Sequence, residues 1–518
     1  MSGQHVAFQQ RGAKEVVADV DFVVVGSGAG GATAAVTLAR GGASVALVEA
    51  GAWRDPDDYP YSMFGQLRDL MDDWGAGVAI GRALWPLVQA RTMGGTTVIN
   101  SAICVRTPDD IFARWKSEHG LPDLRSQVLA ALDGIEKELP IEHVPELAMG
   151  RSNVLAQKGA EALGFHDHAM RRYVKGCEGT GQCLQGCKKG NKQSLNLNYV
   201  PEVRRRGGLI LSCAPVERVL LEGRRAVGVS GNFVHPMLRT RGGKFTVRAK
   251  KGVVIAASVT YSPALLLRSG IKVKALGKFF RSHPGTGVFG VYDQPVDMNL
   301  GATQGWASTK FRTDPGLKLE TLSIPMELVV SRLAGGGSVL MKRLEQARHL
   351  AMWALAVRAD SHGTITPSPF SQRVTVKYQL DKADMARFRH GVKLLAQQHF
   401  AAGAKSILPG IAQFPYELTA DQVHLLDDIP WDQRRYIAVL SHLFGGCVMG
   451  NDPARSVVDG KGRVHGVEGL TVADASVIPT NLGVNPQHTI MGLATVFAEA
   501  LLDDTAGRTS APQVGAVA

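Results

Sequence analysis

A glycine-rich turn between two apolar segments constrains this chain more than any other feature. Residues 20–51 read VDFVVVGSGAGGATAAVTLARGGASVALVEAG. The apolar run 22–25 predicts a buried strand, residues 32–40 predict a helix that ends at a Gly-Gly pair, and residues 44–48 predict a second strand. The segment therefore predicts a βαβ unit with the glycine turn at its first junction.

The residues of this unit have the pattern that binds a dinucleotide. Gly26 allows the tight turn, Gly28 lets the backbone approach a pyrophosphate, and Gly31 permits close packing of helix on strand. Free amides at the start of the helix favour phosphate, and Glu49 ends the second strand where a carboxylate can bind ribose hydroxyls. The motif leaves FAD and NAD open as alternatives.

Length and charge set broader limits. A chain of 518 residues is too long for one core, so we expect two closely connected domains. The formal charge of +12 would suit nucleic acid, but the basic residues are scattered and their densest cluster is only residues 204–206. We expect a solvated basic surface and no nucleic-acid partner.

The sequence also shows no pattern typical of an exported protein. Residues 1–19 contain no continuous apolar stretch, and no window of 18 apolar residues occurs, so we expect neither a secretory signal nor a transmembrane segment. We therefore expect a cytoplasmic protein. A small partner subunit could instead place it on the periplasmic side or at the membrane periphery. Six cysteines are too few for a disulfide scaffold.

A second glycine-rich segment follows at residues 94–100, GGTTVIN. Paired glycines at Gly94 and Gly95, followed by Thr96, suit a backbone that passes close to a flat ligand or a diphosphate. Asn100 can donate and accept hydrogen bonds. We expect this segment to lie against the same ligand as the first turn.

Three of the six cysteines, Cys177, Cys183 and Cys187, fall in one glycine-rich loop with the spacing C-x5-C-x3-C. Soft thiolates suit iron–sulfur clusters or zinc. Because no histidine lies at the usual zinc-finger offset, a [3Fe-4S] cluster fits better than zinc. The alternative is a loop of reduced thiols, whose anionic form Lys188 and Lys189 would favour.

The rest of the chain predicts a return to the first sheet and then a separate domain. Short strands are expected within 209–230 and 245–257, and a helix from 262 to 270; residues 290–430 predict a sheet-and-helix domain with a strand at 373–379 and a helix at 382–402. A strand at Val472 ends in Asp474, and a final helix begins near Pro486, with His442 and Asn485 nearby. The amides of this helix could face a developing anion.

Together these motifs resemble the glucose-methanol-choline (GMC) family of FAD-dependent oxidoreductases, and the likeness covers nearly the whole chain. It rests on the glycine turn, residues 94–96, 256–258 and 262–263, and the segments around His442 and Asn485. The resemblance implies an α/β fold with a Rossmann-type FAD-binding domain (19–130, 200–290 and 432–518) and an α+β substrate-binding domain (131–199 and 291–431). The second domain would include the cysteine loop at 176–190.

The resemblance also implies roles for individual residues. The catalytic base would be His442, with Asn485 as its partner and His488 as the alternative to Asn485. Non-covalent FAD is implied, because no histidine stands near Thr96, where some members attach flavin. The cofactor would be held by Gly26, Gly28, Gly31, Glu49, Gly94, Gly95, Thr96, Asn100, Val216, Asp474, Ala475 and Pro486.

The chain departs from its relatives at two positions. Ser258 stands where the family usually has glycine. The cysteine spacing is similar to that of FAD sugar dehydrogenases with a [3Fe-4S] cluster, but Lys188 stands where they often have proline.

The function implied is oxidation of an alcohol, with the flavin accepting a hydride. Electrons would pass through a cluster on Cys177, Cys183 and Cys187 to an acceptor protein or quinone. The alternatives are an oxygen-dependent alcohol or sterol oxidase without a cluster, and a flavin-binding lyase. Apolar residues in the 290–430 region, among them Leu322 and Met352, predict a hydrophobic alcohol.

Overall fold

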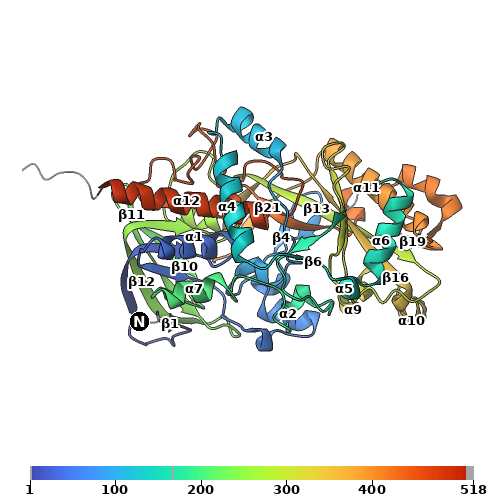
Figure 1. The fold of residues 1–518 in the computed structure, drawn as a ribbon, viewed down its shortest axis with the longest axis horizontal. Coiled ribbons are helices and arrows are strands. Elements are labelled where there is room, and N and C mark those ends of the chain that lie inside the picture. Colours follow the sequence, from blue (N-terminus) through green and yellow to red (C-terminus); the bar gives the residue numbers. More distant parts are fainter. Residues whose placement is uncertain (1–2, 166–167, 509–518) are drawn as a thin grey trace, which may run out of the picture.

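Two β-sheets organise the chain in the computed structural model, which describes residues 3–165 and 168–508 (Figure 1). The first sheet has the order β1-β9-β3-β2-β12-β11-β10, and β22 pairs with β12. Its strands are β1 (His5–Val6), β9 (Leu209–Leu211), β3 (Val45–Val48), β2 (Val16–Val25), β12 (Arg241–Ile255), β11 (Arg225–Val234), β10 (Val216–Glu222) and β22 (Leu470–Val472).

Parallel pairing dominates the centre of this sheet. β2 pairs in parallel with β3 and with β12, and β22 joins the end of β12 in parallel. The predicted strand 22–25 forms the end of β2 and is almost fully buried, as expected for a parallel strand covered on both faces. This arrangement brings the C-terminal ends of β2, β12 and β22 to one edge, where α/β sheets bind ligands.

Three helices far apart in sequence pack together beside the first sheet: α1 (Ala29–Arg40), α4 (Arg125–Glu138) and α12 (Gln487–Arg508) (Figure 1). The helix α1 begins three residues before its predicted start at residue 32, because Gly30 and Gly31 are helical. A Cβ on Gly30 would lie 1.8 Å from the carbonyl oxygen of Ala473. Glycine there allows the helix to start against the neighbouring backbone.

The second sheet is built around β13 (Lys278–Val291), which pairs with β16, β17, β19 and β21. The predicted helix 382–402 is α11 (Lys382–Ala401), and the predicted strand 373–379 is the shorter β18. The other strands are β4 (Val78–Ile80), β5 (Leu84–Pro86), β7 (His168–Ala169), β14 (Trp306–Ser308), β15 (Leu317–Thr321), β16 (Leu350–Val357), β17 (Gly363–Pro367), β18 (Val374–Lys377), β19 (Ser406–Leu408), β20 (Leu418–Thr419) and β21 (Val439–Phe444).

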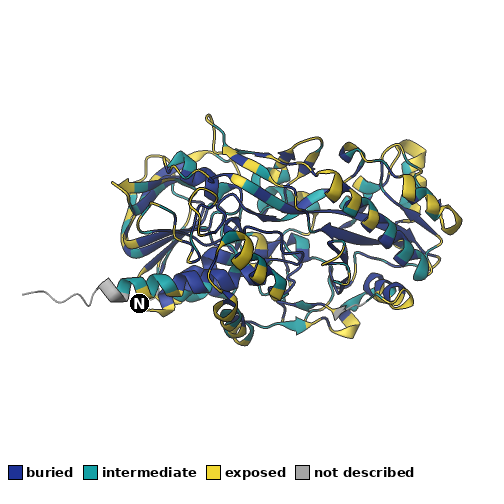
Figure 2. Cartoon of the chain, turned by 90° about the horizontal axis from the view of Figure 1, so that it is seen from above, coloured by how far each residue is buried: buried dark blue, intermediate teal, exposed yellow. Residues whose placement is uncertain are grey.

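A small pair, β6 (Glu142–His143) and β8 (Arg171–Arg172), lies outside both sheets. Buried residues run through the strands of both sheets, while the outer helices carry the exposed positions (Figure 2). The remaining helices are α2 (Met63–Asp69), α3 (Asp109–His119), α5 (Glu146–Met149), α6 (Arg151–Ala162), α7 (Tyr199–Arg205), α8 (Tyr261–Arg268), α9 (Met326–Arg332) and α10 (Gly337–Glu345).

The predicted α/β class with two sheets is confirmed, whereas the exact domain boundaries stay a prediction. Strands β4, β5 and β21 fall in segments assigned from sequence to the FAD-binding domain, yet they join the second sheet. Residues 166–167 and 509–518 of the predicted segments lie outside the described residues. Strands β4, β5 and β21 thereby bring residues of both sheets to one site.

Candidate active site

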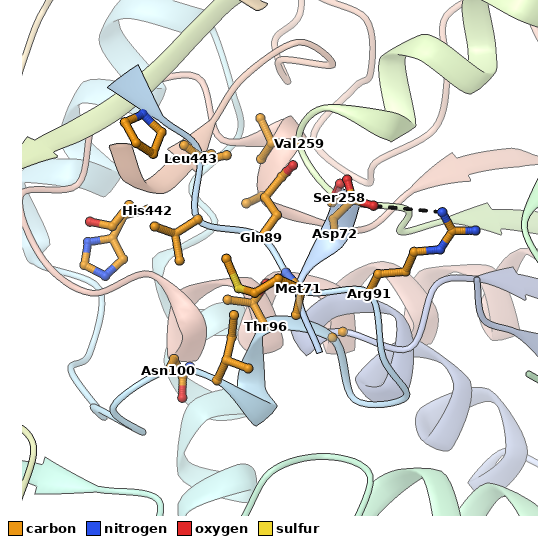
Figure 3. A pocket seen from close by; sticks show the side chains of 18 of the residues that line it. Met71, Asp72, Gln89, Arg91, Thr96, Asn100, Ser258, Val259, His442 and Leu443 are labelled. Carbon is orange, nitrogen blue, oxygen red and sulfur yellow. Dashed lines mark hydrogen bonds and ion pairs between the residues drawn. The ribbon is translucent and has the colours of Figure 1, made fainter. Parts of the chain in front are cut away.

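A cavity of about 1090 Å³ extends from the glycine turn after β2 to strand β21 and the start of α12. Figure 3 shows Thr96, Asn100 and His442 around it. Most of the predicted site residues line this cavity: Gly26, Gly28, Glu49, Gly95, Thr96, Asn100, Val216, His442, Asp474, Ala475, Asn485 and Pro486.

Gly31 and Gly94 are absent from the described cavity lining but pack against residues that line it. A Cβ on Gly31 would lie 1.9 Å from the carbonyl oxygen of Gly26, so Gly31 permits the close packing predicted for it. Gly94 has φ +89° and its amide donates to Ser27 Oγ at 2.9 Å. A Cβ on Gly95 would lie 2.7 Å from Gly28 Cα. The two glycine segments are therefore in contact.

The start of α1 fits a diphosphate. Its first turn contains no acidic residue, and no side chain caps its free amides. Gly28 precedes the helix and lines the cavity, and a Cβ there would meet only the Cα of Gly95, at 3.9 Å, so it would occupy open space beside those amides. The free amides and the helix dipole favour a negative charge in that space.

Glu49 is fixed by the backbone of the first turn. Its Oε2 accepts hydrogen bonds from Ser27 N (2.9 Å) and Ser27 Oγ (2.6 Å), and its Oε1 accepts one from Gly51 N (2.7 Å). The carboxylate lines the cavity at the end of β3, where a ribose hydroxyl is expected. Ser27, which the sequence did not single out, determines its orientation.

Asp474 holds the neighbouring turn. Its Oδ2 accepts hydrogen bonds from Ser258 N (3.0 Å) and Ser262 Oγ (2.5 Å), and its Oδ1 accepts one from Ser476 N (2.8 Å). Burial raises the pKa of Asp474. Ser258 has φ +86°, a conformation that glycine adopts without strain. At this position, where the family usually has glycine, the chain therefore has a serine with a strained backbone.

Asn100 connects the second glycine segment to the last helix. Its Nδ2 donates to Gln487 Oε1 at 2.6 Å, and its Oδ1 accepts from Ala102 N at 2.9 Å. Gln487 is the first residue of α12. The side chain that was predicted to line the flavin thus also fixes the loop that carries Asn485.

A β-bulge presents His442 to the cavity. Strands β13 and β21 pair Ser282 with Leu443 and His283 with Ser441, which leaves His442 as the extra residue. Its φ is +43°, which is uncommon for any residue except glycine. Bulges bend a strand and redirect a side chain, and they occur often beside active sites.

His283, which the sequence reading missed, contacts His442. The amide of Gly483 is shared between His283 Nε2 at 3.0 Å and Asn481 Oδ1 at 3.1 Å, and the two Nδ1 atoms of the histidines lie 2.9 Å apart. Burial and the neighbouring His442 hold the pKa of His283 well below its ordinary value, so His283 is neutral. One of the two Nδ1 atoms therefore donates to the other.

His442 is neutral. Burial lowers the pKa of His442 to about 4, with Glu320 raising it and Lys318 lowering it. Its Nε2 lies 3.3 Å from Asn485 Nδ2 at the cavity wall. Because an amide NH₂ group only donates, His442 Nε2 is the acceptor in this hydrogen bond.

A buried ion pair lies beside Asn485. Lys318 Nζ donates to Glu320 Oε2 at 2.6 Å and also to Asn485 Oδ1. Both charged residues come from β15, whose sequence LKLET places them two positions apart and so on one face. A charged pair alternating with apolar residues in a strand was a signal that sequence reasoning could have used.

His488 takes no part in this arrangement. It is fully buried, its Nδ1 contacts the hydroxyl of Tyr173, and its Nε2 lies 3.1 Å from Glu136. It is absent from the described lining of the cavity. Of the two candidates for the second catalytic group, the structure brings Asn485 to His442.

The three predicted cluster cysteines line one small space of about 20 Å³. Within the described residues, the single set of three metal-ligating atoms within 4.8 Å of one another is Cys104, Glu136 and His488, so the loop thiols do not converge on one ion. Thiolates that bind different irons of a cluster lie further apart. The enclosed space holds about one water, so a cluster would require the loop to move outward.

Two buried cations face these thiols. Arg172 Nη2 donates to Cys183 Sγ at 2.9 Å, and Lys192 donates to the carbonyl oxygens of Cys183 and Asn100 at 2.6 and 3.0 Å. Burial would raise the pKa of Cys183, but the two cations outweigh burial and lower this pKa to about 7. The positive charges of Arg172 and Lys192 therefore favour a negatively charged group at these thiols.

Lys188 and Lys189 do not supply this charge, contrary to the prediction. The Nζ of Lys188 donates to the carbonyl oxygen of Asp57 at 2.9 Å, and Lys189 pairs with Glu178 at 3.3 Å. Lys188 also donates to the carbonyl oxygen of buried Tyr59, and Lys189 lines the small space, but the charges that lower the pKa of Cys183 are those of Arg172 and Lys192.

Two family models match most of the chain: GMC oxidoreductase models align with residues 20–285 and 359–494. The chain is a GMC oxidoreductase. The match includes both glycine segments and the segment with His442 and Asn485, so this GMC protein is an FAD-dependent oxidoreductase, as the sequence predicted. The cradle at α1 and the fixed carboxylate Glu49 fit that cofactor.

Known relatives agree with this assignment. The GMC chain is 34% identical to an uncharacterized GMC-type oxidoreductase of Mycobacterium tuberculosis, over 93% of this chain and 76% of that protein. It is 28% identical to long-chain-alcohol oxidase FAO1 of Arabidopsis thaliana, over 92% and 66%. The fold matches pyridoxine 4-oxidase from Mesorbium loti with a TM-score of 0.70 at 19% identity, covering 93% of this chain and 98% of that one.

Within residues 3–165 and 168–508 of this GMC protein, no helix combines the length and the hydropathy needed to cross a bilayer.

Proposed function

We propose that the protein oxidises the CH–OH group of an alcohol to an aldehyde or ketone, using non-covalently bound FAD. The observation that supports this most directly is the pair His442 and Asn485, whose nitrogens lie 3.3 Å apart on the wall of the cavity that also contains the glycine cradle. Alcohol oxidases among the relatives support the same reaction class.

Different residues would hold the two halves of the cofactor. Gly26, Gly28 and Glu49 would hold the ADP half, and Thr96 and Asn100 would lie along the flavin. When bound, FAD supplies the acceptor for the hydride that leaves the carbinol carbon. All other chemistry falls to the side chains around the alcohol oxygen.

His442 and Asn485 would bind that oxygen. Asn485 offers its Nδ2 group, which lies 3.3 Å from His442 Nε2 on the cavity wall. A preorganised donor stabilises an oxygen as it develops negative charge, which is worth about 3 kcal/mol. We assign this donor role to Asn485, and to His442 the role of the base that takes the hydroxyl proton.

A hydrophobic alcohol fits the substrate end of the cavity. Its walls there are mostly apolar and come from the segment after β15, from β16, from α9 and from the segment before β21; they include Leu322, Ile324, Leu328, Met352, Leu355 and Ile437. An alkyl chain buried there gains about 0.8 kcal/mol per CH₂ group. Long-chain primary alcohols should therefore react better than short ones.

An anaerobic panel of alcohols tests the proposal. The holoenzyme is mixed with 1-butanol, 1-octanol, 1-dodecanol or a sterol, and loss of flavin absorbance is followed. Bleaching that improves with chain length supports the proposed substrate class. If every alcohol leaves the flavin oxidised, the proposed reaction is wrong.

For the route of the electrons we propose that Cys177, Cys183 and Cys187 would hold a [3Fe-4S] cluster once the loop moves outward, and that such a cluster would supply an electron relay toward an acceptor protein or quinone. Arg172 and Lys192 supply the positive charge that an anionic cluster needs, and Leu184 of the same loop lines the large cavity. Iron analysis and low-temperature EPR of anaerobically purified protein test this. A small partner subunit and the cytoplasmic location remain predictions.

The enclosed space of about 20 Å³ favours a second candidate, an oxygen-dependent oxidase whose loop thiols are structural. In that case the purified protein contains flavin without iron, and dioxygen reoxidises the reduced flavin rapidly.

A further inference from the structure

A group of exposed apolar side chains lies between residues 61 and 84, in the segment that contains α2, β4 and β5. They are between 38% and 72% exposed and comprise Tyr61, Phe64, Trp74, Val78, Ile80 and Leu84. Single exposed apolar residues are ordinary on protein surfaces, but a contiguous group marks a site of interaction. This segment is therefore a candidate docking surface.

The hairpin of β4 and β5 turns an apolar face outward. Side chains alternate along a strand, and in β4 Val78 and Ile80 are exposed whereas Ala79 is buried. In β5, Leu84 and Pro86 are exposed and pair with Ile80 and Val78. A strand face that meets only water is ordinarily polar, so this face is unusual for a surface without a partner.

These exposed side chains adjoin the mouth of the large cavity. Met63, Asp73 and Leu84 line the cavity. Phe64 follows Met63, and its ring centroid lies 6.0 Å from that of Trp74, the residue after Asp73. The exposed apolar surface is therefore continuous with the cavity wall.

Two other segments approach the same mouth. Asp73 Oδ1 lies 3.1 Å from Arg373 Nη2, which brings up the loop that carries Phe370, a side chain that is 96% exposed. The amide of Met63 donates to Glu327 Oε1 at 3.2 Å, so α2 lies beside α9, along the lower edge in Figure 1. These contacts connect segments far apart in the sequence around one opening.

The end of α9 completes the arrangement. Arg332 Nη1 donates to the carbonyl oxygen of Ile437 at 3.0 Å, and Ile437 is exposed and lines the cavity. The mouth is thus surrounded by exposed apolar side chains from several segments. We call them the apolar rim: Phe64, Trp74, Ile80, Leu84, Phe370 and Ile437.

Positive charge accompanies the apolar rim. Arg82 and Arg373 are exposed, although each lies within 4 Å of an aspartate. Burial alone lowers the pKa of Arg332, so no described carboxylate offsets its charge. The chain as a whole has a formal charge of +12, which attracts it to an anionic surface. Arginine and aromatic side chains together suit the headgroup region of a bilayer.

The position of the rim favours lipid over a folded partner. A second copy of the chain, or another protein, seated on the rim would cover the mouth through which an alcohol must pass. A bilayer is fluid and dissolves hydrophobic alcohols. Contact with it therefore leaves the mouth open to the substrate class proposed above.

We propose that the apolar rim docks the protein on the surface of an anionic lipid bilayer, with the cavity mouth facing the lipid, so that a hydrophobic alcohol enters directly from the membrane. Rim side chains enter the headgroup and upper acyl region, while the rest of the protein stays in water. The delivery of substrate rests on the proposed alcohol oxidation, whereas the docking does not.

Cosedimentation of the FAD-loaded protein with vesicles tests the docking. The protein should bind vesicles of equal parts phosphatidylcholine and phosphatidylglycerol, more weakly in high salt, and should bind phosphatidylcholine alone less well. Ile80→Ser/Phe370→Ser should lower the affinity for the mixed vesicles about 10-fold or more, because two apolar side chains no longer leave water. Both residues are absent from the described cavity lining.

The matched control removes two exposed apolar side chains outside the rim. Val17 in β2 and Val154 in α6 are 55% and 54% exposed. Val17→Ser/Val154→Ser should bind the mixed vesicles as wild type does. An equal loss of binding in the control and the rim variant would overturn the proposal.

Insertion of the rim has a readout that needs only the wild-type fold. Mixed vesicles with brominated lipids should quench the fluorescence of Trp74, and this part of the quenching should be absent in Trp74→Phe. It tests the proposal even if Ile80→Ser/Phe370→Ser loses FAD. Identical quenching in wild type and Trp74→Phe, or no binding to either kind of vesicle, overturns the docking. So does a stable dimer in solution whose interface contains the rim.

Delivery of the substrate is measured separately. Flavin reduction by 1-dodecanol carried in vesicles should slow about 10-fold in Ile80→Ser/Phe370→Ser, in step with the loss of vesicle binding, while reduction by 1-butanol in water should be unchanged. Reduction by 1-octanol without any vesicle binding refutes the docking alone. Vesicle binding by a protein whose flavin no alcohol reduces refutes the proposed function and leaves the docking intact.

Discussion

The Nδ1 atoms of His283 and His442 lie 2.9 Å apart, although the two residues are 159 positions apart in the chain. The rings meet edge to face, with centroids 5.1 Å apart. The far nitrogen of His283 is held by the amide of Gly483 at 3.0 Å. The histidine that we propose as catalytic therefore depends on a residue of the neighbouring strand for its orientation.

Replacing His283 should impair catalysis without loss of FAD. In His283→Leu the partner of His442 Nδ1 is gone, so we expect flavin reduction to slow about 100-fold. The buried Nδ1 atom of His442 then lacks a hydrogen-bond partner, which should reduce stability by about 1–3 kcal/mol, whereas the Gly483 amide keeps Asn481 Oδ1 as an acceptor. His283→Asn can place an NH₂ group near the position of Nδ1 and should recover part of the rate. Stopped-flow reduction and urea unfolding measure the two effects.

Removing the imidazole of His442 should slow flavin reduction by roughly two to four orders of magnitude. His442→Ala strains a residue with φ +43°, whereas His442→Asn tolerates that conformation better. Both variants should bind FAD normally, because His442 lies at the substrate end. A near-normal rate in a folded variant of either type would mean that His442 does not contact the alcohol.

The protein should lose stability as pH falls from about 6.5 toward 4. Burial lowers the pKa of His442 and His488 to about 4 and that of His399 to about 3. A folded-state pKa below the unfolded value means that the fold favours the neutral ring; its stabilisation is complete above pH 6.5 and declines below it. Each such histidine lowers the free energy of unfolding by up to about 1.4 kcal/mol per pH unit.

Urea unfolding at pH 7.5, 6.0 and 5.0 checks this dependence. His399 is fully buried and stacks on Trp353, with ring centroids 3.7 Å apart. His399→Phe keeps the stacking but cannot be protonated. A loss of stability in this variant as steep as in wild type would count against the histidine explanation.

Glu49→Gln should weaken FAD binding. The carboxylate accepts three hydrogen bonds and is the acceptor proposed for ribose hydroxyls. Losing charge-assisted bonds costs about 1.5–3 kcal/mol, which corresponds to roughly a 10- to 150-fold higher Kd. Flavin fluorescence after ultrafiltration gives the Kd. Once saturated with FAD, the variant should be reduced at the wild-type rate; a normal Kd would remove Glu49 from the proposed cofactor site.

Ser258→Gly should stabilise the fold. Ser258 has φ +86°, and its buried Oγ is among the described side-chain atoms without a hydrogen-bond partner. Relief of backbone strain and removal of that hydroxyl should together exceed the entropy cost of glycine, for a net gain of about 1 kcal/mol. Ser258→Ala removes only the hydroxyl and should gain less. Thermal melts of apoprotein compare the three chains, and a lower Tm for Ser258→Gly contradicts the strain argument.

Local patterns carried most of what the sequence predicted. The glycine turn, the strand before it and the helix after it depend on neighbouring residues, so α1, β3 and the end of β2 were placed within a few residues, while the first six residues of β2 were missed. Helix α11 was predicted almost to the residue for the same reason. Glu49 and Asp474 were recognised because each ends a strand at the ligand edge of a parallel sheet.

The residues that complete the site could not be found in this way. His283 reaches His442 only through the pairing of β13 with β21, and the bulge at His442 depends on that register. Lys318 approaches Asn485 across 167 positions of sequence. Sequence spacing does not show such pairings, although the alternation in LKLET could have drawn attention to β15.

The parallel addition of β22 to β12 has a consequence for biosynthesis. Asp474 follows β22, and α12 then returns to pack on α1, so the nucleotide cradle is completed by residues that are synthesised long after its glycine turn. A nascent chain halted before residue 470 would contain every glycine of the cradle but would leave residues 253–255 of β12 without β22. Flavin loading should therefore wait for the synthesis of α12.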